Sequence, residues 1–246
     1  MKRISSIWMA AAKTLWWKLL LILVLMAAGE ILLLNRAIHL YVQTYEGYRQ
    51  PSFQHLIRDA KIYLVFFAAV VALSACCCLQ GCRFGGKNQY LLQRLPLAEW
   101  QVTALWAVVH LACFAILWAG QLAAVILLWN RYIMEFPASS QGLALLVAFY
   151  DNGFLHGLLP LRDGVRWLLV LGYWPAMAWL TASFSFFQRR DKSLRIGLLL
   201  LLFVYFMLMQ EPGNAATTVL FFVFLLLVLA GNIHGMWGAY HEANTN

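Results

Sequence analysis

The chain has 246 residues, of which 63% are hydrophobic and 11% are charged, and its mean hydropathy is +0.72. Soluble domains carry roughly 45–50% apolar and about 25% charged residues, so this composition excludes a soluble globular protein and indicates a polytopic membrane protein. The formal net charge of +8 at pH 7 indicates topology and contact with lipid surfaces, and we do not interpret it as nucleic-acid binding.

The chain forms one transmembrane domain, residues 1–246, because no polar stretch is long enough to bury a core of its own. We expect an all-α fold with six transmembrane helices. The apolar runs that we expect to cross about 30 Å of hydrocarbon are residues 16–34, 62–82, 102–129, 167–187, 196–210 and 217–240.

The segment before the first span predicts an interfacial helix. Ile4, Trp8 and Leu15 recur at helical spacing among basic residues, a pattern typical of a helix that lies on the inner leaflet. We expect this helix to turn into the first span. The alternative is a signal peptide cleaved near residues 27–29, but the apolar run continues to Leu34 and the region before it is long.

Glu30 lies in the outer half of the first predicted span. A carboxylate at this depth is costly and usually faces a cavity or a partner. Two roles stay open: Glu30 lines a substrate path, or it pairs with a cation on another helix. Arg36 is a poor partner because it sits near the outer surface.

Four cysteines gather at the inner end of the second predicted span. Cys78 and Cys82 share a helical face, whereas Cys76 and Cys77 point elsewhere, so a tetrahedral metal site is not favoured. We interpret them, with Cys113, as small packing residues; palmitoylation near the interface stays open. We predict no metal site and no disulfide.

The connection after the second span carries a short predicted helix. Asn88 is a good N-cap, Pro96 opposes continuation, and Leu91, Leu92 and Leu95 share one face. A helix of seven or eight residues is unstable alone in water, so we expect it to dock onto a partner. Residues 81–88 nearly match a phosphate-binding loop, but Asn88 replaces its hydroxyl residue and no strand precedes it, so the match is coincidental.

A seventh apolar stretch, residues 142–161, is predicted not to span. With six spans and the N-terminus inside, the inside carries 11 of the 18 Lys and Arg residues. A further crossing would place the basic segment 188–195 outside, against the positive-inside rule. We therefore expect an outer, re-entrant or interfacial element between spans three and four.

The polar residues of this outer region invite a catalytic interpretation. Asp151, His156 and Asp163 lie near Arg162 and Arg166 in the sequence. No serine, cysteine or second acid at matching depth completes a catalytic set, so we predict no catalytic residues here and expect a solvated gate or loop. His110, Gln121, Asn232 and His234 are isolated in apolar spans, and we expect them to make interhelical hydrogen bonds.

The predicted elements together resemble those of one family. They are the amphipathic N-terminal helix, the loop helix that ends at Pro96, the six spans with both ends inside and the irregular connection 210–216. The chain is similar, over essentially its whole length, to the six-span permease subunits of ABC-2-type ATP-binding-cassette exporters. The connection 130–166 is enlarged relative to the smallest members.

The resemblance implies a plasma-membrane protein with cytoplasmic termini. It implies a second permease subunit, identical or a sister, and two separate ABC ATPase subunits that bind ATP and Mg²⁺, with no cofactor in this chain. Membrane lipids are further partners, and the favoured cargo is amphipathic or hydrophobic: a drug, an antimicrobial peptide or a lipid-like compound. The residues that would couple to the ATPase are Tyr90, Leu91, Leu92, Arg94, Leu95 and Pro96.

Three alternatives stay open. An ATP-independent sensor, immunity protein or scaffold fits the same composition. An intramembrane enzyme would need paired catalytic groups at one depth, which we cannot assemble. A secondary transporter would show an inverted repeat or matched broken helices, and we see neither in the sequence.

Overall fold

The computed structural model describes residues 2–44, 51–80, 99–136, 143–161, 163–189, 195–210 and 214–245. Within these ranges the regular structure is entirely helical, which confirms the all-α prediction for this part of the chain. The helices are α1 (Lys2–Thr44), α2 (Phe53–Asp59), α3 (Ile62–Gln80), α5 (Glu99–Glu135), α6 (Ala144–Asp151), α7 (Gly153–Leu158), α8 (Gly164–Arg189), α9 (Arg195–Gln210) and α10 (Ala215–Thr245).

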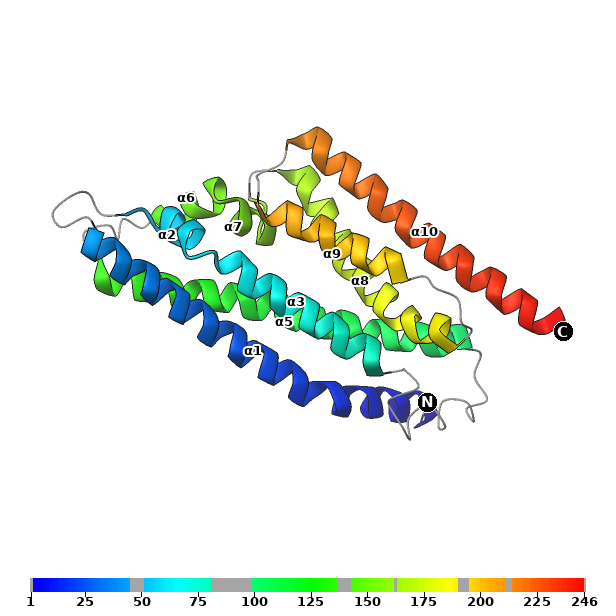
Figure 1. The fold of residues 1–246 in the computed structure, drawn as a ribbon. Coiled ribbons are helices and arrows are strands. Elements are labelled where there is room, and N and C mark those ends of the chain that lie inside the picture. The colour runs from blue at the N-terminus through cyan, green and yellow to red at the C-terminus, as the bar shows by residue number, and fades with distance from the viewer. Residues whose placement is uncertain are drawn as a thin grey trace.

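The long helices form an elongated bundle with two distinct ends (Figure 1). Both chain termini lie at one end, which we call the terminal end. The short helices α2, α6 and α7 gather at the opposite end, which we call the cap end. The helices α1, α3, α5, α8, α9 and α10 run between the two ends.

Five helices are long and apolar enough to cross a membrane: α1, α3, α5, α8 and α10. They correspond to five of the six predicted spans, and the chain is a multi-pass membrane protein by this criterion. The remaining predicted span, residues 196–210, corresponds to α9. This helix has 16 residues and is about 24 Å long, which is shorter than the hydrocarbon core of a typical bilayer.

The first helix differs from its prediction. We expected a separate interfacial helix followed by a span, but α1 is continuous over 43 residues, a length of about 65 Å. The reason lies in the sequence, since no proline or glycine precedes Gly29 and the segment is rich in strong helix formers. Leu15 and Leu19 face the bundle, whereas Trp17 is 75% exposed.

Residues 143–161 form two short helices instead of a span. α6 has 8 residues and α7 has 6, so neither could cross about 30 Å of hydrocarbon. The chain between them is extended at Asn152, and both helices lie at the cap end (Figure 1). This is the geometry expected of the predicted non-spanning element.

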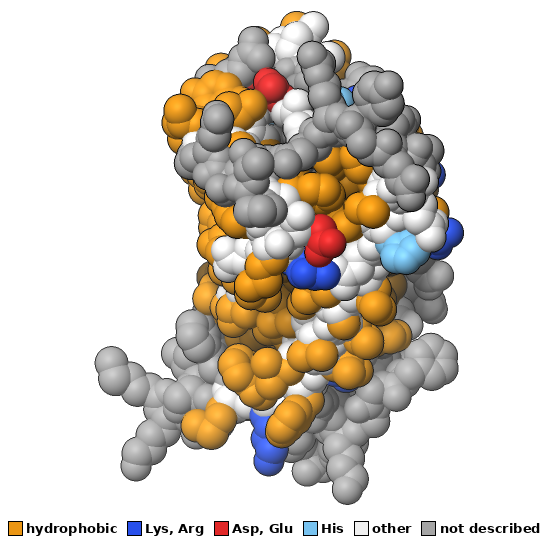
Figure 2. Space-filling view, turned by 90° about the vertical axis from the view of Figure 1, so that its left-hand side faces the viewer, with side chains coloured by type: hydrophobic (Ala, Val, Ile, Leu, Met, Phe, Trp, Pro, Cys, Tyr) orange, Lys and Arg blue, Asp and Glu red, His pale blue; other side chains and the backbone are white. Residues whose placement is uncertain are grey.

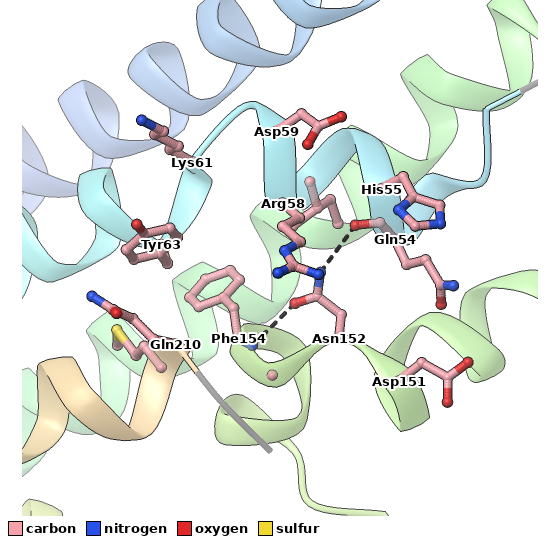
Figure 3. A pocket seen from close by; sticks show the side chains of 13 residues that line it. Gln54, His55, Arg58, Asp59, Lys61, Tyr63, Asp151, Asn152, Phe154 and Gln210 are labelled. Carbon is pink, nitrogen blue, oxygen red and sulfur yellow. Dashed lines mark hydrogen bonds between the residues drawn. The ribbon is translucent and has the colours of Figure 1, made fainter. Parts of the chain in front are cut away.

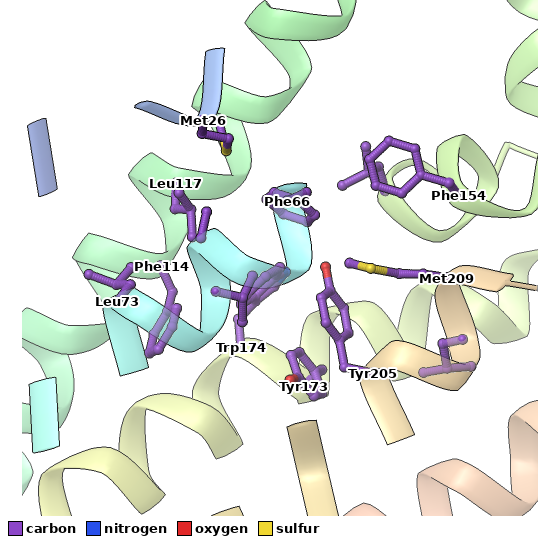
Figure 4. Close-up of a cluster of buried hydrophobic side chains, with 14 of the residues drawn as sticks. Met26, Phe66, Leu73, Phe114, Leu117, Phe154, Tyr173, Trp174, Tyr205 and Met209 are labelled. Carbon is purple, nitrogen blue, oxygen red and sulfur yellow. The ribbon is translucent and has the colours of Figure 1, made fainter. Parts of the chain in front are cut away.

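Aromatic side chains dominate the centre of the core (Figure 4). The rings of Tyr173 and Tyr205 stack with centroids 4.3 Å apart, and Phe66 and Trp174 pack edge-on against Tyr205. These four residues join α3, α8 and α9. Because lipid is as apolar as these rings, the packing depends on close contact and not on exclusion of water.

Glycines allow α1 to approach its neighbours closely. A Cβ at Gly120 of α5 would lie 2.5 Å from Leu23 of α1, and a Cβ at Gly29 would lie 3.3 Å from Val65 of α3. Small residues at such positions are typical of helix pairs within membranes. The long helices expose many large hydrophobic side chains, as lipid contact requires. Figure 2 looks onto the cap end, where hydrophobic side chains lie beside a few charged ones.

Candidate functional site

The predicted coupling residues, Tyr90, Leu91, Leu92, Arg94, Leu95 and Pro96, lie outside the described residues. Cys82 and Arg162 also lie outside them. The flanking helices are described: α3 ends at Gln80 and α5 begins at Glu99. Both of these helix ends lie at the terminal end of the bundle (Figure 1), so the segment between them connects two helices there.

Glu30 is completely buried between α1 and α5. The polar side chain that approaches its carboxyl group is Gln121 of α5, an amide and not the cation that one interpretation expected. Within the described residues, neither the Glu30 oxygens nor the Gln121 amide atoms have a hydrogen bond of standard geometry. Gly29 and Gly120 directly precede the two residues, so the positions where a side chain of a neighbouring helix packs onto a glycine adjoin this buried polar contact.

Two of the expected interhelical hydrogen bonds are present. His110 Nδ1 of α5 lies 3.0 Å from Thr181 Oγ1 of α8, and Trp179 Nε1 of α8 donates to Asn232 Oδ1 of α10 at 3.0 Å. His234, by contrast, is exposed on α10. These bonds join α8 to helices on both sides of it, and they account for His110 and Asn232 without a ligand.

The described cysteines agree with the packing interpretation. Cys77, Cys78 and Cys113 are buried among apolar side chains, Cys76 is half-buried, and none of the four forms a disulfide with another described cysteine. In the described ranges, no cluster of three or more His, Cys, Asp or Glu side chains is arranged to hold a metal ion.

Asn152 organises the cap end, and the sequence analysis did not single it out. Its Oδ1 accepts hydrogen bonds from the backbone N–H groups of Phe154 and Leu155, and so caps α7. Its Nδ2 donates to the backbone oxygen of Gln54 at 3.1 Å, which ties α7 to α2. The available signal was an asparagine directly before a short apolar helical segment, the position of an N-cap.

His156, Asp163 and Arg166 form a second polar group at the cap end. His156 is buried, and its Nε2 donates to Asp163 Oδ2 at 3.3 Å. The Arg166 side chain is 1% exposed, and its Nη2 donates to the backbone oxygen of Leu208 at 2.7 Å. Arg166 thus binds a carbonyl in the last turn of α9, where a cation also complements the helix dipole.

The charge state of His156 follows from its surroundings. Burial and the nearby Arg166 guanidinium lower the pKa of His156, and the Asp163 carboxylate opposes this shift without reversing it. The imidazole is therefore neutral near pH 7. In the described residues His156 contacts an acid but no nucleophile, so the group resembles a structural anchor and not a catalytic set.

Asp151 lies apart from this group, although the sequence placed them together. It lines a half-open cavity of about 850 Å³ between α2, the start of α3, the α6–α7 junction and the end of α9 (Figure 3). The ionisable side chains that line this cavity, which we call the cap cleft, include His55, Arg58, Asp59, Lys61 and Asp151. Most of the residues that line the cap cleft are polar or charged.

Comparison with known proteins gives no match of this chain to a family model, to a curated protein or to a solved structure.

Proposed function

We propose that the chain is the membrane-spanning permease subunit of an ABC exporter. The observation that carries the proposal is that the helix ends flanking the basic connections lie at the terminal end of the bundle. α3 and α5 are joined there by a segment with Arg83, Lys87 and Arg94, and α8 and α9 are joined there by residues 190–194, with Arg190 and Lys192.

The charge distribution supports a cytoplasmic terminal end. The positive-inside rule places Lys- and Arg-rich connections in the cytoplasm, and the N-terminus with Lys2 and Arg3 lies at the same end as those connections. The 18-residue connection 81–98 would then face the compartment that holds ATP. Its predicted helix would be accessible to an ATPase subunit.

The same arrangement supports six crossings. Both termini lie at one end (Figure 1), so the chain passes between the ends an even number of times. Five helices meet the length and hydropathy expected of a span, and α9 supplies the sixth passage. A helix of 16 residues crosses if the bilayer thins beside it or if neighbouring protein shields its ends.

In this function the chain converts movement of an ATPase into movement of its helices. ATP and Mg²⁺ bind in the partner, and Leu91, Leu92 and Leu95 occupy a groove on its surface. ATP binding favours one state of the permease through differential affinity. The cargo passes at the interface with a second permease subunit, and the apolar, aromatic character of the helices favours an amphipathic or hydrophobic cargo.

The test is copurification from the native membrane in mild detergent. We expect a stoichiometric ATPase subunit with the wild-type chain, and its loss with Leu91→Asp/Leu95→Asp. The matched control is Gln89→Asp/Gln93→Asp, which adds the same two charges to the opposite face of the same predicted helix and should retain the ATPase.

Two results would contradict the proposal, and a third would show that the variants are unsuitable for the test. A wild-type chain that purifies without any ATPase, under conditions that keep other such complexes together, would favour an ATP-independent sensor, scaffold or immunity protein. An ATPase retained equally by the Leu91→Asp/Leu95→Asp variant would remove the coupling role of this segment. Loss of the ATPase from both double variants would indicate general disruption of the connection.

A further inference from the structure

We propose that the cap cleft binds the zwitterionic headgroup of a phospholipid, with its phosphate at Arg58 and Lys61 and its ammonium group at Asp151. This site is independent of ATP-driven transport and of the coupling segment. It rests on the charges of the cleft, on its depth relative to the membrane helices and on the backbone conformation of Lys61.

The charges of the cap cleft are not neutralised within the described structure. Arg58, Lys61 and Asp151 are all exposed, and none of them forms an ion pair with another described residue. The described contacts of charged groups at this end involve other residues: Arg131 pairs with Glu135, and the neutral His156 ring donates a hydrogen bond to Asp163. A cleft with unpaired charges of both signs is complementary to a ligand that also carries both signs.

The cationic and the anionic side chains lie in different parts of the cap cleft. Figure 3 shows the Arg58 guanidinium in the cap cleft, with Lys61 on one side and Asp151 on the other, and the Lys61 ammonium group is directed away from Arg58. Asp59 is directed away from the Arg58 guanidinium. Guanidinium groups bind phosphate oxygens in a bidentate manner, so Arg58 and Lys61 form the phosphate side, and Asp151 is left to contact an ammonium group.

The cap cleft lies at the level where the membrane helices end. α3 begins at Ile62 directly after Lys61, and α9 ends at Gln210, which lines the cleft. Two apolar helices therefore terminate at its wall. A cavity at this depth meets headgroups of the adjacent leaflet, because the acyl chains begin beside the helices below it.

α6 independently marks the same interface. The exposed large side chains of α6 and of its N-cap residue are Leu143, Leu146, Val147 and Tyr150. Their spacing of i, i+3, i+4 and i+7 forms one face of a helix. A short helix with one apolar face exposed lies at the boundary of headgroups and acyl chains. The cleft begins at Asp151, the last residue of α6, so the occupant comes from the lipid layer and not from a soluble peptide.

Lys61 occupies a position that favours glycine. Its φ of 52° lies in the left-handed region, which is unfavourable for a residue with a Cβ. The strained residue joins α2 to α3, where its N–H donates to Arg58 O at 3.1 Å. Strain of this kind is concentrated at functional sites. Compared with glycine, a lysine at this position lowers backbone stability and adds a positive charge to the cap cleft.

The test measures lipid retention by native mass spectrometry of the full chain in detergent. Phosphatidylethanolamine carries both charges of the headgroup, whereas phosphatidylglycerol carries only the phosphate charge. We expect Arg58→Gln and Lys61→Gly each to weaken retention of both lipids about tenfold, as expected for loss of one charge-assisted contact. Asp151→Asn should weaken only phosphatidylethanolamine and remove its preference over phosphatidylglycerol.

Lys61→Gly guards against misfolding as an explanation, because glycine suits the φ of this position and should not lower the midpoint of thermal unfolding. Arg36→Gln removes an exposed cation of α1 outside the cleft and should leave retention of both lipids unchanged.

Competition with soluble phosphoethanolamine distinguishes binding of a free headgroup from binding of a whole phospholipid. Competition by it shows that the headgroup alone suffices, and retention without competition shows that the acyl chains contribute; both support a headgroup site. Equal retention of both lipids by wild type and by Arg58→Gln/Lys61→Gly would overturn the proposal. An unchanged preference for phosphatidylethanolamine in Asp151→Asn would also overturn it.

Discussion

The enclosed polar groups and the cap cleft use similar residues in opposite ways. Glu30 and Arg166 are at most 1% exposed, and each meets a group on a neighbouring helix: Gln121 of α5 and Leu208 of α9. In the cap cleft, Arg58 and Asp151 are exposed and meet no partner of opposite charge in the described structure. Burial thus makes the first set part of the fold, and exposure leaves the second set available to a ligand.

The largest expected effect is that of Arg166→Ala. The substitution removes a buried charge-assisted hydrogen bond to Leu208 and leaves a cavity between α7, α8 and α9, so we expect destabilisation of about 3 kcal/mol or more. Thermal unfolding in detergent measures this change. The control Arg131→Ala removes an exposed ion pair with Glu135 and an exposed hydrogen bond to Asn35, and it should change stability by less than about 1 kcal/mol. Equal effects of the two variants would contradict the distinction between buried and exposed cations.

The next effect concerns Gln121→Leu, which leaves Glu30 without its polar neighbour in the interface between α1 and α5. We expect a loss of about 1–2 kcal/mol. The double variant Glu30→Leu/Gln121→Leu should recover most of it, because an apolar pair needs no hydrogen bond. A double-mutant cycle of unfolding free energies measures the coupling, and additive single effects would show that the two side chains act independently.

Asn152→Ala should have a moderate effect at the cap end. It removes the cap of α7 and the bond to the backbone of Gln54, and we expect a loss of about 1 kcal/mol. Asn152→Asp separates the two roles, since its carboxylate still caps α7 but cannot donate to Gln54. Proteolysis of the connection between α2 and α3 reports release of α2. Resistance equal to wild type in Asn152→Ala would contradict the tie between these helices.

The smallest expected effect is a pH dependence that arises from His156. Burial and Arg166 lower the pKa of His156 in the folded chain, so the unfolded state binds a proton more readily. Its contribution to stability is therefore present above the usual histidine pKa of 6.5 and is lost as pH falls below it. Unfolding midpoints at pH 7 and pH 5 should differ more for wild type than for His156→Gln. An identical difference would show that His156 does not titrate on unfolding.

The sequence predicted the elements of the bundle because lipid imposes a simple rule. Every long apolar run must satisfy its backbone internally, so each predicted span corresponds to a helix. The helix ends were harder to predict: α1 extends to Thr44 because no breaker follows Leu34, and hydropathy marks the membrane boundary but not the helix boundary. The predicted span 196–210 corresponds to α9. Because this helix is short, its crossing of the membrane is part of the proposed topology.

The candidate sites were only partly predictable, because pairing across the bundle depends on helix rotation. Glu30 stood out as an intramembrane acid, but its neighbour Gln121 lies 91 positions later and could not be inferred from spacing. Asp151 and His156 are close in sequence, yet the extended residue Asn152 between their helices turns one toward the cap cleft and the other into the interior. Arg58 and Lys61 were missed, since isolated basic residues before a span carry no distinctive pattern.

α1 is a long continuous helix whose close contact with α5 lies near its middle. Leu23, the residue that meets the backbone of α5 at Gly120, is the midpoint of the helix Lys2–Thr44, so the two arms are each about 30 Å long. A tilt about this point moves the two tips by equal distances in opposite directions. A displacement of one end of α1 is therefore transmitted to its other end, because the helix is continuous from Lys2 to Thr44.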